Sequence, residues 1–325
     1  MSTSPSSCTD GLTVSVVICA YTTDRWDVLV QAVEAVLRQL RSGDELLLVV
    51  DHAKDLLESA RAQFTAAQVV ENIHPQGLSG ARNTAVEIAR GDVVAFLDDD
   101  VVPTTGWLEN MLRLYGDPAV VGVGGQVDAV WSGDEPRWLP PEFLWVVGCS
   151  YRGLPTRVSP VRNPIGANMS FRREVFEAVG LFAESLGRVG TLPVGCEETE
   201  LAIRVGRHYG SRAIVHQPAS IVNHHMTRGR ERVAYFYRRC WSEGRSKAAV
   251  SRLVGDGAAL SSERAYVTRT LPRAVARELI AAAGGQREAL ARAVNVVLGT
   301  LVTAAGYAGY RLTLAAHSTS SEASD

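Results

Sequence analysis

Short apolar runs alternate with amphipathic stretches along the first hundred residues, and this alternation limits the fold more than any other feature. The apolar runs are residues 14–19, 46–50, 69–70 and 93–97. The stretches with apolar side chains at helical spacing are residues 28–37, 56–67 and 77–89. Continuous apolar strands separated by amphipathic helices predict an α/β fold, with a mostly parallel central sheet covered on both faces.

Side chains that can carry chemistry follow directly after the predicted strands. They are Tyr21, Asp51 and the three aspartates at 98–100. In parallel sheets the ligand crevice lies at the carboxyl ends of the strands. We therefore expect these side chains to converge on one edge of the sheet.

Three consecutive aspartates need a physical reason, because neighbouring carboxylates repel each other. A divalent Mg²⁺ or Mn²⁺ ion, held by one or two carboxylates and by substrate phosphates, supplies one. In an extended segment Asp98 and Asp100 point to one side and Asp99 to the other, so the outer pair predicts a metal site. The alternative interpretation is a solvated acidic turn.

Residues 77–83 (GLSGARN) predict a glycine-bounded turn into a helix. Backbone amides at a helix N-terminus favour anions, and Arg82 can reach a phosphate or a carboxylate. The segment matches neither the dinucleotide-binding glycine pattern nor the P-loop, which argues against NAD-dependent enzymes and P-loop NTPases. Alternatively, it is an ordinary helix start with Arg82 in solvent.

Two acidic residues, Glu197 and Glu198, begin another predicted helix. Acids are common in a first turn because they face the helix dipole, whereas the functional alternative is a general base that deprotonates an acceptor hydroxyl. Further on, His224 precedes Arg228 and Arg230. This combination offers a metal ligand and phosphate partners, with a structural histidine as the alternative.

The chain changes character after Pro103. Residues 120–130 predict one more strand, and six prolines interrupt residues 136–164. Trp131, Trp138 and Trp145 lie around this stretch at seven-residue spacing, which suits either a wall for sugar stacking or anchors of a core.

Residues 226–275 hold eleven Arg or Lys against four Asp or Glu, so the formal net charge of -2 conceals a basic segment. It is a candidate for contact with an anionic lipid or a diphosphate, or else a solvated helical face. It lacks a recognition motif for nucleic acid, so we expect no nucleic-acid partner.

The C-terminal stretch, residues 276–313, is rich in Ala, Leu and Val and predicts helix. Between Arg292 and Arg311 it has no charge, but this length is marginal for spanning a bilayer. We expect a packed helix, with contact to a membrane surface as the alternative. The expected organisation is a tail at 1–12, an α/β domain at 13–222, a basic and then apolar helical region at 223–316, and a tail at 317–325.

The N-terminal residues lack the pattern of a secretory signal, and the five cysteines include no CxxC pair. Both features favour a reducing, cytoplasmic compartment.

Seven segments, in their order along the chain, resemble those of family 2 glycosyltransferases, which are inverting, metal-dependent enzymes of the GT-A fold. The segments are VSVVICAY, LLLVVD, GLSGARNTA, VVAFLDDD, GANMSFRREVFEAVGLF, GCEETEL and VNHHMTRGR. The resemblance covers roughly residues 14–250 and implies a GT-A fold with a C-terminal helical appendage. The sequence after the histidine motif also resembles members that build polysaccharides and glycolipids.

The resemblance implies a role for each matching residue. Contact with the donor nucleotide is implied for Ala20, Tyr21, Thr22, Asp51, Gly80, Arg82, Asp98 and Asp99, with Thr22 in place of the usual Asn. The implied metal ligands are Asp98, Asp100 and His224. The implied catalytic base is Glu198 or Glu197, since the usual Glu-Asp pair is Glu-Glu here. Contacts with the diphosphate or the acceptor are implied for Arg228, Arg230 and Asn168. Trp138 is a candidate acceptor contact from the aromatic pattern described above.

The implied function is inverting transfer of a sugar from a nucleotide-sugar donor, of the UDP type, to an acceptor hydroxyl, assisted by Mn²⁺ or Mg²⁺. The implied acceptor is a carbohydrate, a lipid-linked molecule or a small molecule, and the implied location is cytoplasmic, with peripheral contact to the inner face of the cell membrane. Two alternatives remain open. One is a nucleotidylyltransferase, although residues 20–26 lack its glycine-rich basic loop; the other is a non-catalytic nucleotide- or carbohydrate-binding protein on the same fold.

Overall fold

The computed structural model describes residues 11–186, 195–255, 257 and 261–322, without the side chains of 261–262 and 314–322. The chain divides into two compact units. The described part of the sheet unit is residues 11–130, 155–186 and 197–225. The described part of the helical unit is residues 131–154, 195–196, 226–255, 257 and 261–322.

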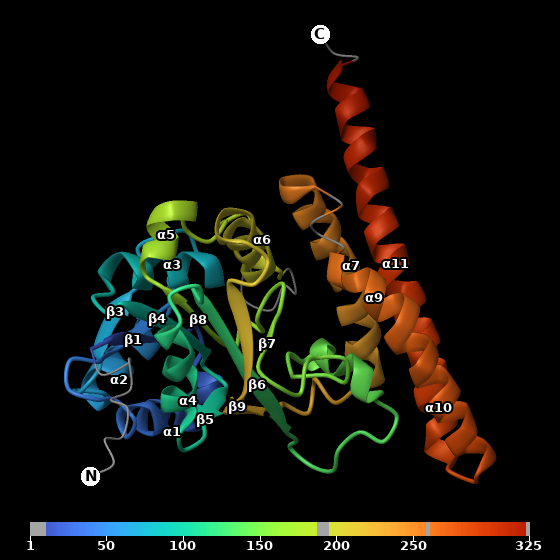
Figure 1. Cartoon of the computed structure of the whole chain (residues 1–325), viewed down its shortest axis with the longest axis horizontal. Helices are drawn as coiled ribbons and strands as arrows, with labels where there is room; N and C mark the ends of the chain where they lie inside the picture. Colours follow the sequence, from blue (N-terminus) through green and yellow to red (C-terminus); the bar gives the residue numbers. More distant parts are fainter. Residues whose placement is uncertain (1–10, 187–194, 256, 258–260, 323–325) are drawn as a thin grey trace, which may run out of the picture. The chain divides into compact units, whose positions relative to one another are not determined.

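Within the described residues, nine strands of the sheet unit form one sheet in the order β3-β2-β1-β4-β8-β6-β9-β5, with β7 paired to β9 (Figure 1). The strands are β1 (Val14–Ala20), β2 (Glu45–Val50), β3 (Gln68–Glu71), β4 (Val93–Asp98), β5 (Val101–Pro103), β6 (Gly122–Val130), β7 (Ser159–Pro160), β8 (Asn168–Arg172) and β9 (Ile214–His225). The helices of this unit are η1 (Thr23–Arg25), α1 (Trp26–Leu37), α2 (Lys54–Gln63), α3 (Leu78–Ile88), α4 (Trp107–Arg113), η2 (Leu114–Gly116), α5 (Glu174–Val179) and α6 (Glu197–Tyr209).

The first part of the sheet confirms the predicted alternation. β1 pairs in parallel with β2 and β4, and β2 pairs in parallel with β3. β1 is buried along its whole length, as a continuous apolar run between two helical layers predicts. The second helix ends earlier than predicted, because Phe64 leaves helical geometry and packs against Trp26, with ring centroids 5.4 Å apart.

The second part of the sheet is mixed. β8 runs antiparallel to both β4 and β6, β6 is parallel to β9, and β5 is antiparallel to β9. The predicted strand at 120–130 is β6, which begins at Gly122. The β5–β9 register sets Val101 opposite His224, so the histidine motif lies next to the strand that follows the three aspartates.

The helical unit contains η3 (Pro141–Val147), α7 (Val233–Val254), α9 (Ser261–Ala265), the π-helical segment η4 (Tyr266–Thr270), α10 (Leu271–Ala283) and α11 (Arg287–Glu322). Its core includes Phe143 and Phe236, whose ring centroids lie 5.5 Å apart. Trp138 packs edge-on against Phe236 at 5.7 Å. Because these side chains share a core, residues 131–154 group with the C-terminal helices, whereas the sequence placed them in the α/β domain.

Helices α7 and α11 cross at two glycines. A Cβ atom on Gly244 would lie 2.0 Å from the carbonyl oxygen of Thr303, and one on Gly306 would lie 2.3 Å from that of Trp241. Real Cβ atoms do not approach an oxygen this closely, so only glycine permits the observed crossing. Gly244 and Gly306 are therefore packing positions.

The predicted tails compare with the structure as follows. Residues 1–10 of the tail expected at 1–12 lie outside the described residues. At the other end, the backbone of α11 remains helical to Glu322, so the tail expected from residue 317 begins as helix. Residues 323–325 lie outside the described residues.

Candidate active site

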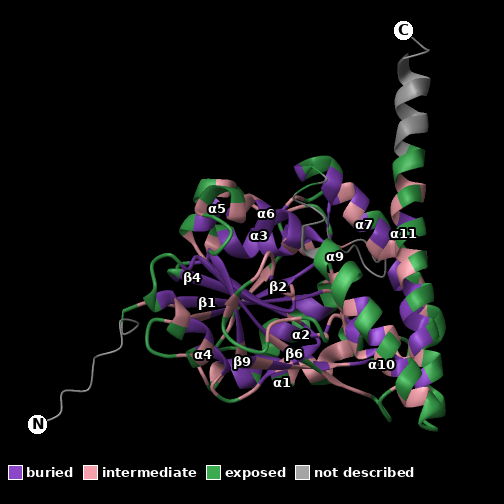
Figure 2. Ribbon diagram, turned by 45° about the vertical axis from the view of Figure 1, so that its right-hand side comes forward, coloured by how far each residue is buried: buried purple, intermediate pink, exposed green. Residues whose placement is uncertain are grey.

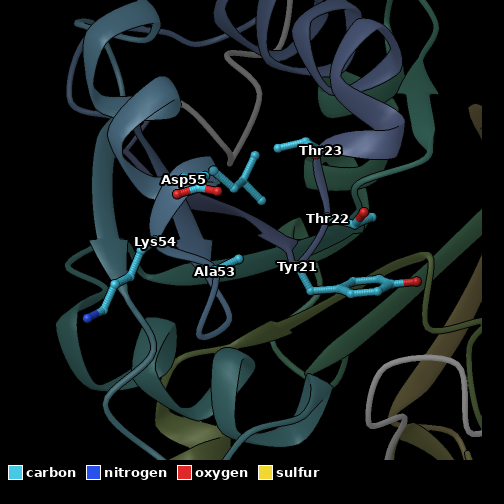
Figure 3. A pocket seen from close by; sticks show the side chains of 7 residues that line it. Tyr21, Thr22, Thr23, Ala53, Lys54 and Asp55 are labelled. Atoms are coloured by element: carbon cyan, nitrogen blue, oxygen red, sulfur yellow. The ribbon is translucent and has the colours of Figure 1, made fainter.

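A pocket of about 390 Å³ opens where β1 and β2 end (Figure 3). Its lining comprises Tyr21, Thr22, Thr23, Ala53, Lys54, Asp55 and Leu56. The side chains of Tyr21 and Lys54 extend in opposite directions from it (Figure 3). Adjacent parallel strands bring the two loops together, as the crevice rule predicts. Tyr21 and Thr22 of the predicted nucleotide contacts line this pocket, and Ala20 ends the buried strand behind them.

The carboxylate of Asp51, which follows β2, accepts hydrogen bonds from the protein itself. The amide of Gly77 donates to its Oδ2 atom at 3.0 Å, and the side-chain amide of Asn72 donates to its Oδ1 atom at 2.7 Å. His52 Nδ1 lies 2.9 Å from the same Oδ1 atom. Asp51 thus ties the end of β2 to the start of α3, and it is only 7% exposed.

Gly80 packs closely against another segment of the protein on the side where a side chain would otherwise lie. A Cβ atom there would lie 2.2 Å from the carbonyl oxygen of Pro75. The glycine therefore allows the first turn of α3 to pack against residues 72–75, which carry Asn72. We conclude that the glycine predicted to contact the nucleotide positions the loop beside Asp51 by close packing.

Arg82 is a buried hub that joins three distant segments. Its Nη1 atom donates to Glu197 Oε1 at 2.7 Å, and its Nη2 atom donates to Asp98 Oδ1 at 3.2 Å and to the carbonyl oxygen of Gly166 at 3.1 Å. The residue is 1% exposed. Burial alone would lower the pKa of Arg82, but Glu197 and Asp98 raise it above its ordinary value, so the charge persists. Of the two partners predicted for Arg82, phosphate or carboxylate, the structure shows carboxylate.

The three aspartates do not follow the alternation expected of an extended segment. β4 ends at Asp98, and the chain turns at Asp99 and Asp100. As a result Asp99 and Asp100 both form ion pairs with Arg25, the latter at 3.1 Å, while Asp98 faces Arg82. The prediction that Asp98 and Asp100 share one side and Asp99 the other is wrong, because a turn abolishes the period of two.

This turn concentrates negative charge. Asp99 and Asp100 are each 3% exposed, and Asp99 Oδ2 has no hydrogen-bond partner among the described residues. Burial raises the pKa of Asp99 to about 7; the guanidinium of Arg25 opposes the rise, and Asp100 adds to it. A buried pair of acids with one arginine is an environment that a further cation would stabilise.

Arg25 was missed by the sequence interpretation. It precedes α1 in the loop after β1, and its guanidinium lies 5.4 Å from the centre of the Tyr21 ring. The available signal was a cation in a loop that the crevice rule places at the acidic edge of the sheet.

His224 lies beside Asp100, with 3.1 Å between Nε2 and Oδ1, and is 3% exposed. The described residues contain no group of three or more His, Cys, Asp or Glu side chains that could hold a metal ion by themselves. The carboxylate of Asp100, the imidazole of His224 and the orphaned oxygen of Asp99 nevertheless offer donors that Mn²⁺ accepts. They fit a cation whose remaining ligands are phosphate oxygens and water.

The two candidate bases differ in access. Glu197 is 4% exposed, its Oε1 atom is bonded to Arg82, and its Oε2 atom has no hydrogen-bond partner among the described residues. Glu198 is partly exposed and accepts a hydrogen bond from Thr199 Oγ1 at 3.3 Å. Its Cγ atom lies 3.7 Å from the position a Cβ on Gly166 would take. Only Glu198 therefore combines solvent access with a place beside the Arg82 hub.

Asn168, a predicted acceptor contact, lies on β8 opposite Leu97 of β4. Asn168 is fully buried; its amide donates to the carbonyl oxygens of Gln126 and Ser220 and accepts from Trp107 Nε1, so the packing uses both ends of the side chain. This leaves no amide atom directed at a ligand, and we assign Asn168 a structural position instead of the predicted acceptor contact.

Trp138, Arg228 and Arg230 belong to the helical unit. Trp138 packs on Phe236 in that unit's core, which favours the core-anchor alternative of the sequence interpretation. Arg228 is exposed and Arg230 is half-buried. Their predicted contacts with a diphosphate or an acceptor remain predictions.

Comparison with known proteins gives a family and a close relative. The family model described as glycosyl transferase family 2 matches residues 15–180. The chain is similar to the glucosyl-dolichyl phosphate glucuronosyltransferase of Haloferax volcanii, with 34% identity over 244 residues, or 74% of this chain and 78% of the relative.

Solved structures share the fold. The mannosyltransferase PcManGT from Pyrobaculum calidifontis, in complex with GDP-Man and Mn²⁺, superposes with a TM-score of 0.56 at 17% identity, covering 90% of this chain and 86% of that one. GalNAc-T7 with UDP, GalNAc and Mn²⁺ superposes with a TM-score of 0.51 at 18% identity, covering 67% of this chain and 44% of that longer one.

Proposed function

The chain belongs to glycosyl transferase family 2 and is a glycosyltransferase that uses nucleotide-sugar donors, and we propose that it inverts the anomeric centre by a single displacement with Glu198 as general base. The observation that carries this proposal is the pair of glutamates at the start of α6. One is sequestered by the Arg82 hub, and the other has access to solvent next to it.

In the proposed reaction the carboxylate of Glu198 accepts the proton of an acceptor hydroxyl. The hydroxyl oxygen forms a bond to the anomeric carbon of the donor as the bond between that carbon and the phosphate oxygen breaks. The electron pair of the broken bond leaves with the nucleoside diphosphate. Attack on the face opposite the leaving group inverts the anomeric configuration.

Glu197 acts in this proposal as a positioning residue. Its bond to Arg82 fixes the first turn of α6 relative to Asp98 and Gly166, which belong to two other segments. The neighbouring Glu198 is thereby held at the same edge of the sheet as the three aspartates. Such preorganisation matters, because small displacements of a reacting group lower the rate strongly.

We propose that Asp100 and His224 would hold Mn²⁺ or Mg²⁺ together with oxygens of the donor diphosphate. When bound there, the cation neutralises negative charge on the departing diphosphate. The excess of carboxylates over arginines at the turn after β4 supports this proposal, as does the Mn²⁺ present in both solved neighbours. The pocket at the ends of β1 and β2 would take the nucleoside, with Tyr21 at one side.

For the substrates we propose a UDP-sugar and a lipid-linked acceptor. The archaeal relative is, by name, a glucuronosyltransferase that acts on glucosyl-dolichyl phosphate, and it matches 74% of this chain. A glycosylated polyprenyl phosphate is therefore the first acceptor to test. With such an acceptor, we propose that the reaction takes place at the cytoplasmic face of the cell membrane.

The test is transfer from UDP-glucuronate and other UDP-sugars to a glucosylated polyprenyl phosphate, with Mn²⁺, Mg²⁺ or a chelator present. We expect metal-dependent transfer and a product whose anomeric configuration, measured by NMR, is opposite to that of the donor. A retained configuration would refute the single displacement. Transfer from GDP-sugars alone would refute the proposed donor and leave the mechanism standing.

A further inference from the structure

The outward face of α11 is apolar over a long distance. Between residues 290 and 308 every exposed residue of this helix is apolar; the exposed residues are Leu290, Ala291, Val294, Val297, Leu298, Leu301, Ala304, Ala305 and Ala308. Leu301 is 59% exposed and Leu290 is 53% exposed. At a rise of 1.5 Å per residue this face is about 27 Å long. An unbroken apolar face of this length on a helix marks a binding surface.

The opposite face of α11 contains buried residues (Figure 2) and makes polar contacts within the helical unit. Asn295 donates to the carbonyl oxygen of Trp138 and accepts from the Tyr237 hydroxyl, and Arg292 donates to Glu278 at 2.7 Å. The helix also crosses α7 at the two glycines described above.

The segment Arg287–Thr313 is long and apolar enough to cross a membrane by its length and composition. Crossing would, however, take the buried polar face and the arginine-rich α7 into hydrocarbon, which is strongly unfavourable. The two faces together fit a helix that lies flat, with its apolar side in a membrane interface.

Helix α7, which packs against α11, carries residue types that are typical of a membrane interface. On α7, Arg238, Arg245 and Arg252 are exposed and recur every seven residues, so they lie along one side of the helix. The guanidinium of Arg245 stacks 5.7 Å from the ring centre of Tyr310 on α11. Trp241, which is 43% exposed, packs beside Gly309. Arginine, tryptophan and tyrosine beside an apolar band suit the headgroup region of a bilayer.

The same pattern continues on α10. Leu279 and Ile280 are 48% and 74% exposed at its C-terminal end, and exposed arginines flank it at Arg273 and Arg287. An exposed surface that combines apolar residues with an excess of arginines is complementary to an anionic lipid surface. A second copy of this chain would bring the same arginines together, which charge repulsion disfavours.

We propose that the apolar face of α11, together with the exposed arginines of α7 and α10, binds the surface of an anionic lipid bilayer with the helix axis in the membrane plane. This contact holds the helical unit at a membrane without a transmembrane crossing. It is independent of which sugar or acceptor the enzyme uses.

The test is co-sedimentation of the full chain with vesicles of phosphatidylcholine alone and of phosphatidylcholine mixed with phosphatidylglycerol. We expect wild-type protein to pellet with the anionic vesicles and less with the neutral ones. Leu298→Glu/Leu301→Glu should lower partitioning by about tenfold or more, because two apolar contacts are replaced by charges. Arg238→Gln/Arg245→Gln should lower binding to anionic vesicles only, by about fivefold per arginine.

The matched control is Ile73→Glu/Val158→Glu, which places two glutamates at exposed apolar positions of the sheet unit. This variant should pellet like wild type, since it has the same added charge elsewhere. Thermal unfolding followed by circular dichroism verifies that each variant is folded.

The proposal would be overturned if wild-type protein pelleted with none of the vesicles, or if the Leu298→Glu/Leu301→Glu variant pelleted like wild type. A wild-type dimer that the same variant converts to a monomer would also overturn it, because a second copy would then cover the face. Transferase activity measured on a soluble acceptor separates these outcomes from the proposed function, which stands or falls on transfer alone.

Discussion

The two units of the molecule differ in how many arginines contact their buried carboxylates. At the acidic edge of the sheet unit one arginine serves two carboxylates. Arg25 pairs with Asp99 and Asp100, and Arg82 pairs with Asp98 and Glu197. In the helical unit three arginines serve the two buried acids Glu142 and Glu278: Arg152 and Arg277 contact Glu142, and Arg277 and Arg292 contact Glu278.

We interpret this as a difference between acidic residues that bind a ligand and acidic residues that stabilise the fold. A buried carboxylate without enough positive charge is unfavourable, so the excess of acids at the carboxyl edge of the sheet supports the proposed cation site. Fully neutralised acids indicate structure. The helical unit has an excess of positive charge, which fits the anionic surface proposed above.

The largest expected effect is a loss of transfer activity without a loss of stability. Glu198→Gln should lower the rate of transfer about a thousandfold, because the amide cannot accept the acceptor proton. The melting temperature should stay close to that of wild type, since Glu198 is partly exposed. Steady-state transfer and calorimetry measure the two quantities. Glu197→Gln is the comparison variant; it should destabilise the fold by leaving the buried Arg82 with less negative charge. A thousandfold loss confined to Glu197→Gln would reverse the assignment.

The next effect tests whether the helical unit depends on shape. Gly306→Ala should lower the free energy of unfolding by about 2–3 kcal/mol, because the new methyl group meets the carbonyl oxygen of Trp241. Gly309→Ala is the control in the same helix. Its methyl group would lie 3.6 Å from the Trp241 ring, and alanine forms helix more readily than glycine. Equal stability of the two variants in urea denaturation would contradict the close crossing of α7 and α11.

The third effect concerns the neutralised acids. Burial alone would raise the pKa of Glu278, but hydrogen bonds from Arg277 and Arg292 hold it below the ordinary value of 4.5. A depressed carboxyl pKa contributes stability above about pH 4.5, and this stability is lost as the pH falls through the folded value. Glu278→Gln should therefore cost about 2 kcal/mol at neutral pH and flatten the acid limb of the stability curve. The pKa of Glu288 is also lowered, by its hydrogen bonds and by Arg137 and Arg292, but its side chain is exposed, so Glu288→Gln should change both quantities much less. A similar change in both variants would show that burial of Glu278 between two arginines has no special effect.

The smallest effect returns to the acidic turn. Arg25 supplies the positive charge next to Asp99 and Asp100, so it competes with any other cation there. Arg25→Gln should bind Mn²⁺ about tenfold more tightly in the absence of donor, measured by electron paramagnetic resonance. Arg38→Gln, which removes an exposed pair with Glu34, is the control. Weaker Mn²⁺ binding by Arg25→Gln would show that the arginine supports the cation site.

Local patterns predicted most of the sheet unit. The alternation of strands and helices up to β4, the strand at β6 and the helix at α6 all follow from periodicity, which neighbouring residues determine. The position of the acids at the ends of strands followed as well. The direction of Asp99 and Asp100 did not, because a turn begins where the periodic segment ends.

The other features could not be predicted, because they depend on contacts between residues that are far apart in the sequence. Nothing near Arg82 in the sequence indicates that its partners are 115 and 84 residues away, at Glu197 and Gly166. Residues 131–154 carry no periodic signal that assigns them to the C-terminal helices. Trp138 belongs there because its ring packs on Phe236, and a sequence pattern carries no information on that pairing.

By itself, the sequence determined the α/β class, the edge of the sheet where the chemistry gathers and the acidic residues that supply it. These properties depend on the period of apolar side chains, which is local, and on the general preference of strand–helix–strand segments for parallel pairing. The tertiary structure alone decided which acid is sequestered, which cation shares the aspartates and which face of α11 stays apolar and exposed. Those outcomes depend on contacts between segments far apart in the chain, where close packing and charge pairing select one partner among many.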